Sequence, residues 1–154
     1  MTILQRLMLW LIPFQLWQCS SQGKGTLSMN KEIINTGEAP APIGPYSQAV
    51  WAGNLLFCSG QIAINPKDGS LDTANIETET KRVMENIGAI LRAAGLDFGA
   101  VVKTTIFLKD MNDFAAVNAV YGSYFKDAFP ARETVQVSVL PKNVNVEISV
   151  TALR

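Results

Sequence analysis

The chain contains no histidine and little charge of either sign. None of its 154 residues is histidine and 17% are charged, against about 25% in a typical globular domain. Without imidazole, proton transfer must rely on carboxylates, hydroxyls or water. The formal net charge is zero and no run of lysine or arginine occurs, so the basic footprint of a nucleic-acid-binding protein is missing. A surface this poor in charge indicates that a partner covers part of it, and a second copy of the chain is the simplest candidate.

Cysteine is almost as scarce. Cys19 and Cys58 form no CxxC pair, and without histidine a zinc site is not expected. Cys19 lies in an N-terminal segment unlike the rest, which leaves the remainder one thiol and no internal disulfide, as in proteins of a reducing compartment. The sequence also shows no glycine-rich phosphate loop and no internal repeat.

The N-terminal segment, residues 1–28, reads as a leader or an extension. Arg6 precedes an apolar stretch over 7–17, which is shorter than the about 20 residues of a transmembrane helix. This pattern is typical of a signal or organelle-targeting peptide, although an A-x-A cleavage pattern is missing. Alternatively, translation begins at Met29 and the upstream residues are an extension. We assign the domain to 29–154 and expect a cytoplasmic location, with export or organelle targeting as the alternative.

Hydrophobic periodicity divides the domain into strands and two helices. Apolar residues recur at three- and four-residue spacings over 75–94, which predicts an amphipathic helix ended by Gly95. A second helical stripe covers 114–125 and ends before Phe129-Pro130. This order predicts one α+β domain in which both helices pack on one face of a mixed or antiparallel sheet. The predicted strands before the last two are Glu32–Asn35, Ser47–Trp51, Leu55–Ile64 and Val101–Leu108, with a hairpin turn at Ala52-Gly53-Asn54.

The last 24 residues contain two alternating segments separated by Pro141-Lys142-Asn143. Each segment has one apolar face and one small polar face, which predicts a terminal hairpin whose apolar faces are buried. Arg132 and Glu147 lie on the polar faces, an arrangement more typical of a pocket than of a solvated surface. In a tight hairpin they would lie about 13 Å apart, too far for one small substrate. We therefore expect them to meet across a subunit boundary, or Glu147 to act through water.

Three segments, in this order and spacing, resemble those of a known family. They are IGPYSQ at 43–48, CSGQ at 58–61, and FPARET at 129–134 continuing to Leu140-Pro141 and VEI at 146–148. Together they resemble the Rid family (RidA/YjgF-type reactive intermediate deaminases, formerly called translation-inhibitor-like proteins), over essentially all of 29–154.

The resemblance implies a fold, an assembly and an activity. The fold is a chorismate-mutase-like subunit, and the assembly is a homotrimer that binds a small 2-imino or 2-oxo acid in inter-subunit clefts. The activity is hydrolysis of 2-iminobutanoate and 2-iminopropanoate to 2-oxo acids and ammonia. Such imines arise from enamines released by pyridoxal-phosphate dehydratases, whereas the protein itself is expected to need no cofactor or metal. Neither nucleic acid nor a membrane is an expected partner of the domain.

The resemblance also assigns the two catalytic candidates. It makes Arg132 the anchor of the substrate carboxylate, a task that suits a bidentate guanidinium. Glu147 would orient water or transfer protons. From spacing alone, Arg132 could instead form a surface or interface ion pair, and Glu147 could be a solvated strand residue.

Six more residues are candidates for contact with the substrate. Tyr46 would cover its aliphatic tail, or alternatively pack in the core or an interface, while Asn118 lines the pocket or packs within its helix. Thr134 departs from the family pattern, because many relatives carry cysteine at this position. No thiol-dependent behaviour is therefore expected. The full set is Tyr46, Ser59, Gly60, Gln61, Asn118 and Thr134.

Three other functions remain open from the sequence. The same trimeric cleft could bind a 2-oxo acid without turnover, which Glu147→Gln would leave intact. A protein-protective or scaffold trimer is another reading. An RNA-acting translation inhibitor fits poorly with zero net charge, the absence of histidine and the lack of a basic aromatic platform.

Overall fold

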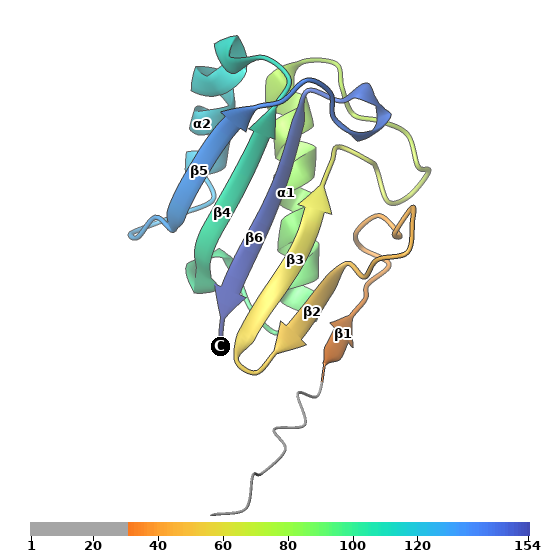
Figure 1. Ribbon diagram of the computed structural model, residues 1–154, viewed down its shortest axis with the longest axis vertical. Helices are drawn as coiled ribbons and strands as arrows, with labels where there is room; N and C mark the ends of the chain where they lie inside the picture. Colours follow the sequence, from red (N-terminus) through yellow and green to blue (C-terminus); the bar gives the residue numbers. More distant parts are fainter. Residues whose placement is uncertain (1–30) are drawn as a thin grey trace, which may run out of the picture.

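A six-stranded sheet carries both helices on one of its faces (Figure 1). The computed structural model describes residues 31–154, and the predicted leader lies outside them. The strand order is β1-β2-β3-β6-β4-β5, and every neighbouring pair is antiparallel except the parallel pair β4 and β5. A single α+β domain with a mixed sheet is therefore confirmed. The elements are β1 (Glu32–Ile34), β2 (Ala49–Ala52), β3 (Leu55–Gln61), α1 (Ile76–Ala93), β4 (Val101–Leu108), α2 (Phe114–Gly122), β5 (Ala131–Gln136) and β6 (Val146–Leu153), with 3-10 turns at Phe98–Ala100, Met111–Asp113 and Pro141–Asn143.

The first helix begins and ends as its sequence predicts. The Asn75 side chain accepts a hydrogen bond from the Thr78 backbone N–H at 2.8 Å, which caps the N-terminus. Gly95 follows the C-terminus with φ at 75°, a left-handed conformation that costs glycine little. The apolar side of α1 is buried against β3 and β6, through side chains that include Val83, Met84, Ile87, Ile90 and Leu91.

The second helix is shorter than its apolar stripe. α2 ends at Gly122. The aromatic residues that follow it lie in a loop and pack their rings in a cluster. Phe98 lies 5.1 Å from Tyr124 and 5.7 Å from Phe125, measured between ring centroids. In the part of the chain that the structure describes, neither helix is long and apolar enough to cross a membrane.

The predicted terminal hairpin is wrong, because β4 lies between the two segments. β5 follows α2 and runs parallel to β4, as a strand after a crossover helix does. β6 pairs antiparallel with the other side of β4 and with β3. The connection between β5 and β6 contains Lys142 and Asn143 in left-handed conformations, with φ at 54° and 58°. Alternation along the chain shows which residues share a face, but not which strand will be the neighbour.

The faces of β5 are also opposite to the prediction. Arg132 and Thr134 pair with Thr104 and Ile106, two buried residues on the helix side of β4, so β5 turns its polar residues toward α2. Val135 faces the other side and is 42% exposed. Within residues 31–154, no helix or strand packs on this face of β5. In β6 the prediction is confirmed, with four alternate residues buried: Val146, Ile148, Val150 and Ala152.

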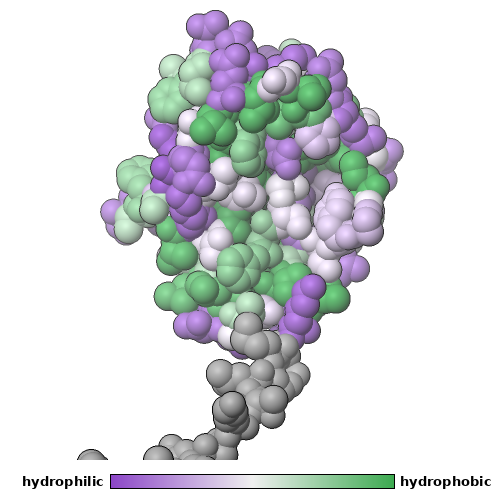
Figure 2. Space-filling view, viewed as in Figure 1, coloured by the Kyte–Doolittle hydropathy of each residue, from purple (hydrophilic) through white to green (hydrophobic). Residues whose placement is uncertain are grey.

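No helix or strand among the described residues covers the sheet face opposite α1 and α2. Phe57 on β3 is 48% exposed there, and the exposed side chains of Lys103 and Glu133 form an ion pair. Figure 2 shows this face, on which hydrophobic and weakly polar residues occupy much of the centre while strongly hydrophilic ones lie largely toward the rim. Such a surface is typical of a protein interface. That further copies of the chain cover it stays a prediction.

Candidate active site

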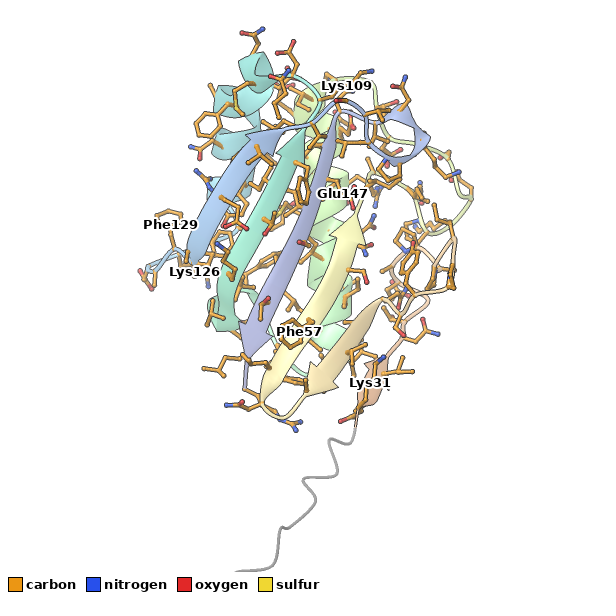
Figure 3. The ribbon with its side chains drawn as sticks, in the orientation of Figure 1. Lys31, Phe57, Lys109, Lys126, Phe129 and Glu147 are labelled. Atoms are coloured by element: carbon orange, nitrogen blue, oxygen red, sulfur yellow. The ribbon has the colours of Figure 1, made fainter. Side chains whose placement is uncertain are left out.

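A cavity of about 270 Å³ opens beside Glu147, where the pairing of β3 with β6 becomes irregular. Figure 3 shows Glu147 on β6 near the end of β3. Its carboxylate is half-buried, and this burial raises its pKa. A carboxyl group with a raised pKa gives and takes a proton closer to neutral pH, as acid/base catalysis requires. The cavity is lined by Pro40, Ala41, Ile43, Tyr46, Gln48, Ser59, Gly60, Gln61, Ile62, Ile64, Pro141 and Glu147.

The absence of a side chain at Gly60 makes room for Glu147. A Cβ atom at Gly60 would lie 2.8 Å from Cδ and 3.1 Å from Cγ of Glu147, and closer still to its Oε1. The carboxylate therefore lies directly over the β3 backbone. The register shift of β3 falls in the same segment, between Cys58 and Gln61, as irregularities next to functional sites commonly do. The group that closely approaches the Gly60 backbone is thus the Glu147 side chain.

One wall of the cavity is a loop held by Gln48, a residue that the sequence did not single out beyond its place in a motif. Gln48 is 2% exposed. Its Oε1 accepts from the Thr36 backbone N–H at 2.7 Å, and its Nε2 donates to the carbonyls of Thr36, Ala39 and Pro40 at 3.0, 3.2 and 2.9 Å. One buried amide thus replaces the strand pairing that this proline-rich loop lacks. The available signal was a glutamine directly before the apolar strand β2.

Tyr46 lines the same cavity as Glu147, while its predicted contact with the substrate stays a prediction. Its hydroxyl accepts a hydrogen bond from the Ile43 backbone N–H at 3.2 Å, and its side chain is about half exposed. Ile43 is also exposed and lines the cavity. The two side chains form an outer wall that is mainly apolar, suited to a short aliphatic group.

Ser59 and Gln61 line the cavity and also tie its floor together. The Ser59 hydroxyl donates to the Ser47 carbonyl at 2.7 Å. Gln61 is buried, and its Nε2 donates to the carbonyls of Ser59 and Gly60, both at 3.3 Å. Five of the eight predicted site residues therefore surround one cavity: Tyr46, Ser59, Gly60, Gln61 and Glu147.

Arg132 occupies a second site, supported by α2. Its Nη1 donates to Asn118 Oδ1 at 2.7 Å. Its guanidinium carbon lies 5.1 Å from the ring centroid of Tyr121 and 5.7 Å from that of Phe114, within the range of a cation–π contact. Tyr121 is itself fixed, because its hydroxyl donates to Thr104 Oγ1 at 3.1 Å. The sequence missed Phe114 and Tyr121 as supports, although both lie on one helical stripe with Asn118.

Arg132 and Glu147 do not share a cavity within one chain. Arg132 pairs with Thr104 and Glu147 with Phe107, positions of β4 that point to opposite faces of the sheet. Three residues along β4 and two strand spacings separate them by roughly 14 Å. Arg132 lines a different hollow, of about 400 Å³, together with Asn118 and residues that include Phe129, which Figure 3 shows near the start of the edge strand, away from Glu147.

Thr134 lines neither of these two cavities. Its Oγ1 is buried and has no hydrogen-bond partner among the described residues. Thr134 points to the helix side of β5, as Arg132 does two residues earlier. Its predicted contact with the substrate stays a prediction. Within residues 31–154, no group of three potential metal ligands is found.

Comparisons with known proteins agree with the motifs. The model of the family described as Endoribonuclease L-PSP matches residues 36–154. A RutC family protein of Pyrococcus horikoshii is 54% identical, over 80% of this chain and 98% of its own. The human protein named 2-iminobutanoate/2-iminopropanoate deaminase is 46% identical, over 82% of this chain and 93% of its own. The crystal structure of Escherichia coli TdcF with bound serine superposes with a TM-score of 0.77 at 43% identity, covering 80% of this chain and 98% of that one. The chain therefore belongs to the Endoribonuclease L-PSP family, which is the YjgF/RidA family expected from its motifs.

Proposed function

We propose that the protein hydrolyses 2-iminobutanoate and 2-iminopropanoate to the 2-oxo acids and ammonia. The observation that carries the proposal is the half-buried Glu147 carboxylate, whose pKa is raised by burial, at the edge of a small cavity with apolar walls. The names of relatives at 46–49% identity support the reaction class. We assign the protein no cofactor, because imine hydrolysis needs only water, a carboxylate anchor and proton transfer.

The active unit is a homotrimer of chorismate-mutase-like subunits, with the site between adjacent subunits. This assembly is supported by the uncovered, partly apolar sheet face and by the separation of Arg132 from Glu147 in one chain. Arg132 lies on the edge strand β5 and is exposed, so it is free to reach a neighbouring subunit. A closed arrangement would bring the arginine of one subunit to the cavity of the next.

The reaction uses the two groups in sequence. Arg132 holds the carboxylate of the imino acid by two parallel N–H···O bonds. Glu147 takes a proton from water as the water oxygen bonds to the C=N carbon and the C=N electron pair moves to nitrogen, and Glu147 then gives this proton to that nitrogen. The carbinolamine next collapses: Glu147 takes the hydroxyl proton as the C=O bond forms, and gives it to nitrogen as the C–N bond breaks and ammonia leaves. Imino acid and water are thereby converted to oxo acid and ammonia.

Oxo-acid release in competition with semicarbazide tests this proposal. Freshly generated 2-iminobutanoate is divided between hydrolysis and capture by semicarbazide, and wild type, Arg132→Ala and Arg154→Ala are compared. Arg154 is a matched control, because its guanidinium also lies over an aromatic ring, that of Trp51 at 4.4 Å. We expect acceleration by wild type and Arg154→Ala that is lost in Arg132→Ala. A folded wild-type protein without acceleration would refute deamination of this substrate.

A non-catalytic binder of 2-oxo acids or similar small carboxylates is the alternative. Bound serine in the solved TdcF structure is the observation that favours it, since that protein holds a small amino acid. Glu147→Gln separates the two functions. A binder should keep its affinity for 2-oxobutanoate in this variant, whereas a deaminase should lose its acceleration of oxo-acid release. The family description mentions an endoribonuclease, but the chain has zero net charge, which favours a small substrate over RNA.

A further inference from the structure

Two buried polar side chains of α1 contact the backbone on both sides of the Glu147 cavity. Glu79 is 0% exposed and Asn86 1% exposed, although both lie on a helix face otherwise packed with apolar residues. They are seven residues apart, which places them two turns apart on the same side of the helix. A buried carboxylate and a buried amide are costly unless their polar atoms are paired. Their partners therefore indicate why they are there.

Glu79 accepts the backbone N–H groups that lead into β6. Its Oε1 accepts from the backbone of Asn145 at 2.6 Å and of Val146 at 3.3 Å, and its Oε2 accepts from Asn145 Nδ2 at 2.8 Å. Val146 is the first residue of β6 and directly precedes Glu147. The carboxylate thus fixes the backbone immediately before the proposed acid/base residue.

Asn86 performs the complementary task on the other strand. Its Nδ2 donates to the carbonyls of Ile62 at 3.1 Å and Ile64 at 2.9 Å. These residues follow the end of β3 at Gln61 and line the cavity. Beyond this point β3 and β6 no longer pair, since Gln61 and Ile148 form their last pair. The two backbone segments separate there, and the separation forms the cavity.

We propose that Glu79 and Asn86 are positioning residues that hold these two segments apart and set the position of Glu147. One supplies acceptors to backbone N–H groups and the other supplies donors to backbone carbonyls, so each pairs with backbone at the point where β3 and β6 no longer pair with one another. Neither lines the cavity, and both act through backbone. The part of this inference that concerns reaction rate rests on the proposed deaminase activity.

The test compares Glu79→Leu, Asn86→Leu, Glu79→Gln and the control Glu85→Leu. Glu85 is on the same helix but its side chain is 41% exposed, so the control makes the same chemical change at the surface. At a temperature where all variants are folded, kcat and KM for 2-iminobutanoate are measured, together with backbone amide hydrogen exchange by NMR. A fold-stabilising role alone would lower the unfolding temperature without changing kcat of the folded enzyme.

We expect Glu79→Leu and Asn86→Leu each to lower kcat about 10- to 100-fold, as displacement of a catalytic group by about 1 Å does. KM should stay within about 3-fold of the wild-type value, because Arg132 is untouched. Amide exchange should accelerate at Asn145 and Val146 in Glu79→Leu, and at Ile64 in Asn86→Leu. Glu79→Gln keeps one acceptor oxygen for the two backbone N–H groups. The partly buried Asn145 amide can rotate so that its Oδ1 accepts from the new glutamine Nε2. We therefore expect this variant to restore most of the activity.

Wild-type kcat and wild-type exchange in a folded Glu79→Leu would overturn the inference, and so would an equal loss in Glu85→Leu. If Glu79→Leu does not fold, Asn86→Leu applies the same criteria on the other segment. If the wild-type protein releases no oxo acid, the deaminase proposal fails, and amide exchange at 145–146 and 64 alone then supports or overturns the positioning role.

Discussion

Adding one methyl group at Gly60 should displace the Glu147 carboxylate while leaving the fold intact. The new Cβ would lie 2.8 Å from Cδ of Glu147 and closer to its Oε1, whereas ordinary contacts between such atoms begin at about 3.4 Å. The colliding atoms are the end of a flexible side chain, so Glu147 can yield by rotating. Gly60 is not among the described glycines with a positive φ. Alanine therefore fits its backbone conformation without strain.

The magnitude of each effect follows from these contacts. A displacement of about 1 Å in a catalytic group costs up to about 100-fold in kcat, which is about 2.7 kcal/mol of transition-state stabilisation. For stability, replacing a strand glycine gains about 0.5–1 kcal/mol of backbone entropy, and moving Glu147 off its rotamer costs about 0.5–1.5 kcal/mol. The two terms nearly cancel, so we expect the unfolding temperature to move by no more than about 5 °C.

Steady-state kinetics in the semicarbazide assay, with thermal unfolding by circular dichroism, measure both quantities. Gly37→Ala is the matched control, since a Cβ there would meet nothing within 4 Å. We expect the control to keep wild-type kcat and Gly60→Ala to lose it. Wild-type kcat in Gly60→Ala would show that the position of Glu147 does not set the rate. A large fall in unfolding temperature would show instead that the backbone moves.

Three further outcomes follow from buried groups. Burial raises the folded-state pKa of Glu147 above its usual 4.5, so the charged carboxylate destabilises the folded protein once the pH exceeds the folded-state pKa. Glu147→Gln should therefore unfold at a higher temperature than wild type at pH 7. The difference should vanish below pH 4.5, where the carboxyl group is protonated in both states. Gln48→Ala leaves several buried loop groups unpaired and should lower the unfolding free energy by about 2–4 kcal/mol in denaturant titrations, whereas the exposed Gln136→Ala should lower it by less than about 1 kcal/mol. Burial raises the pKa of Cys58 to about 12, so the native Cys19→Ser protein should not react with a disulfide reagent at pH 8 but should react once unfolded; fast native labelling would contradict its burial.

Some elements could be predicted because their signals are local. The Asn75 cap and Gly95 define the ends of α1, and the β2–β3 hairpin turns at Gly53, whose φ is 64°. The buried face of β6 follows from strict alternation, since a strand with one covered side has a single compatible phase. Three short motifs likewise contain the five predicted site residues that line one cavity in the structure.

Other features depend on which strands become neighbours. The valines at 135, 137 and 139 alternate as regularly as the apolar residues of β6, yet Val135 is exposed, because it lies on the face of β5 opposite the helices. For the same reason, Arg132 and Glu147 lie on opposite faces of the sheet. Alternation fixes the relative faces within one strand and contains no information about the strand beside it.

The sequence by itself therefore determined the class of fold, the ends of α1, the family, and the residues capable of acid/base and carboxylate chemistry. Only the tertiary structure decided that β4 separates β5 from β6, that Glu147 lies over the Gly60 backbone, and that Glu79 and Gln48 pair with distant backbone groups. The physical reason is range. Capping, periodicity and motifs act within a few residues, whereas buried polar pairing joins Glu79 to Val146, 67 residues away, and strand pairing joins Leu55 to Leu153. The free energy of these contacts depends on the whole packed arrangement.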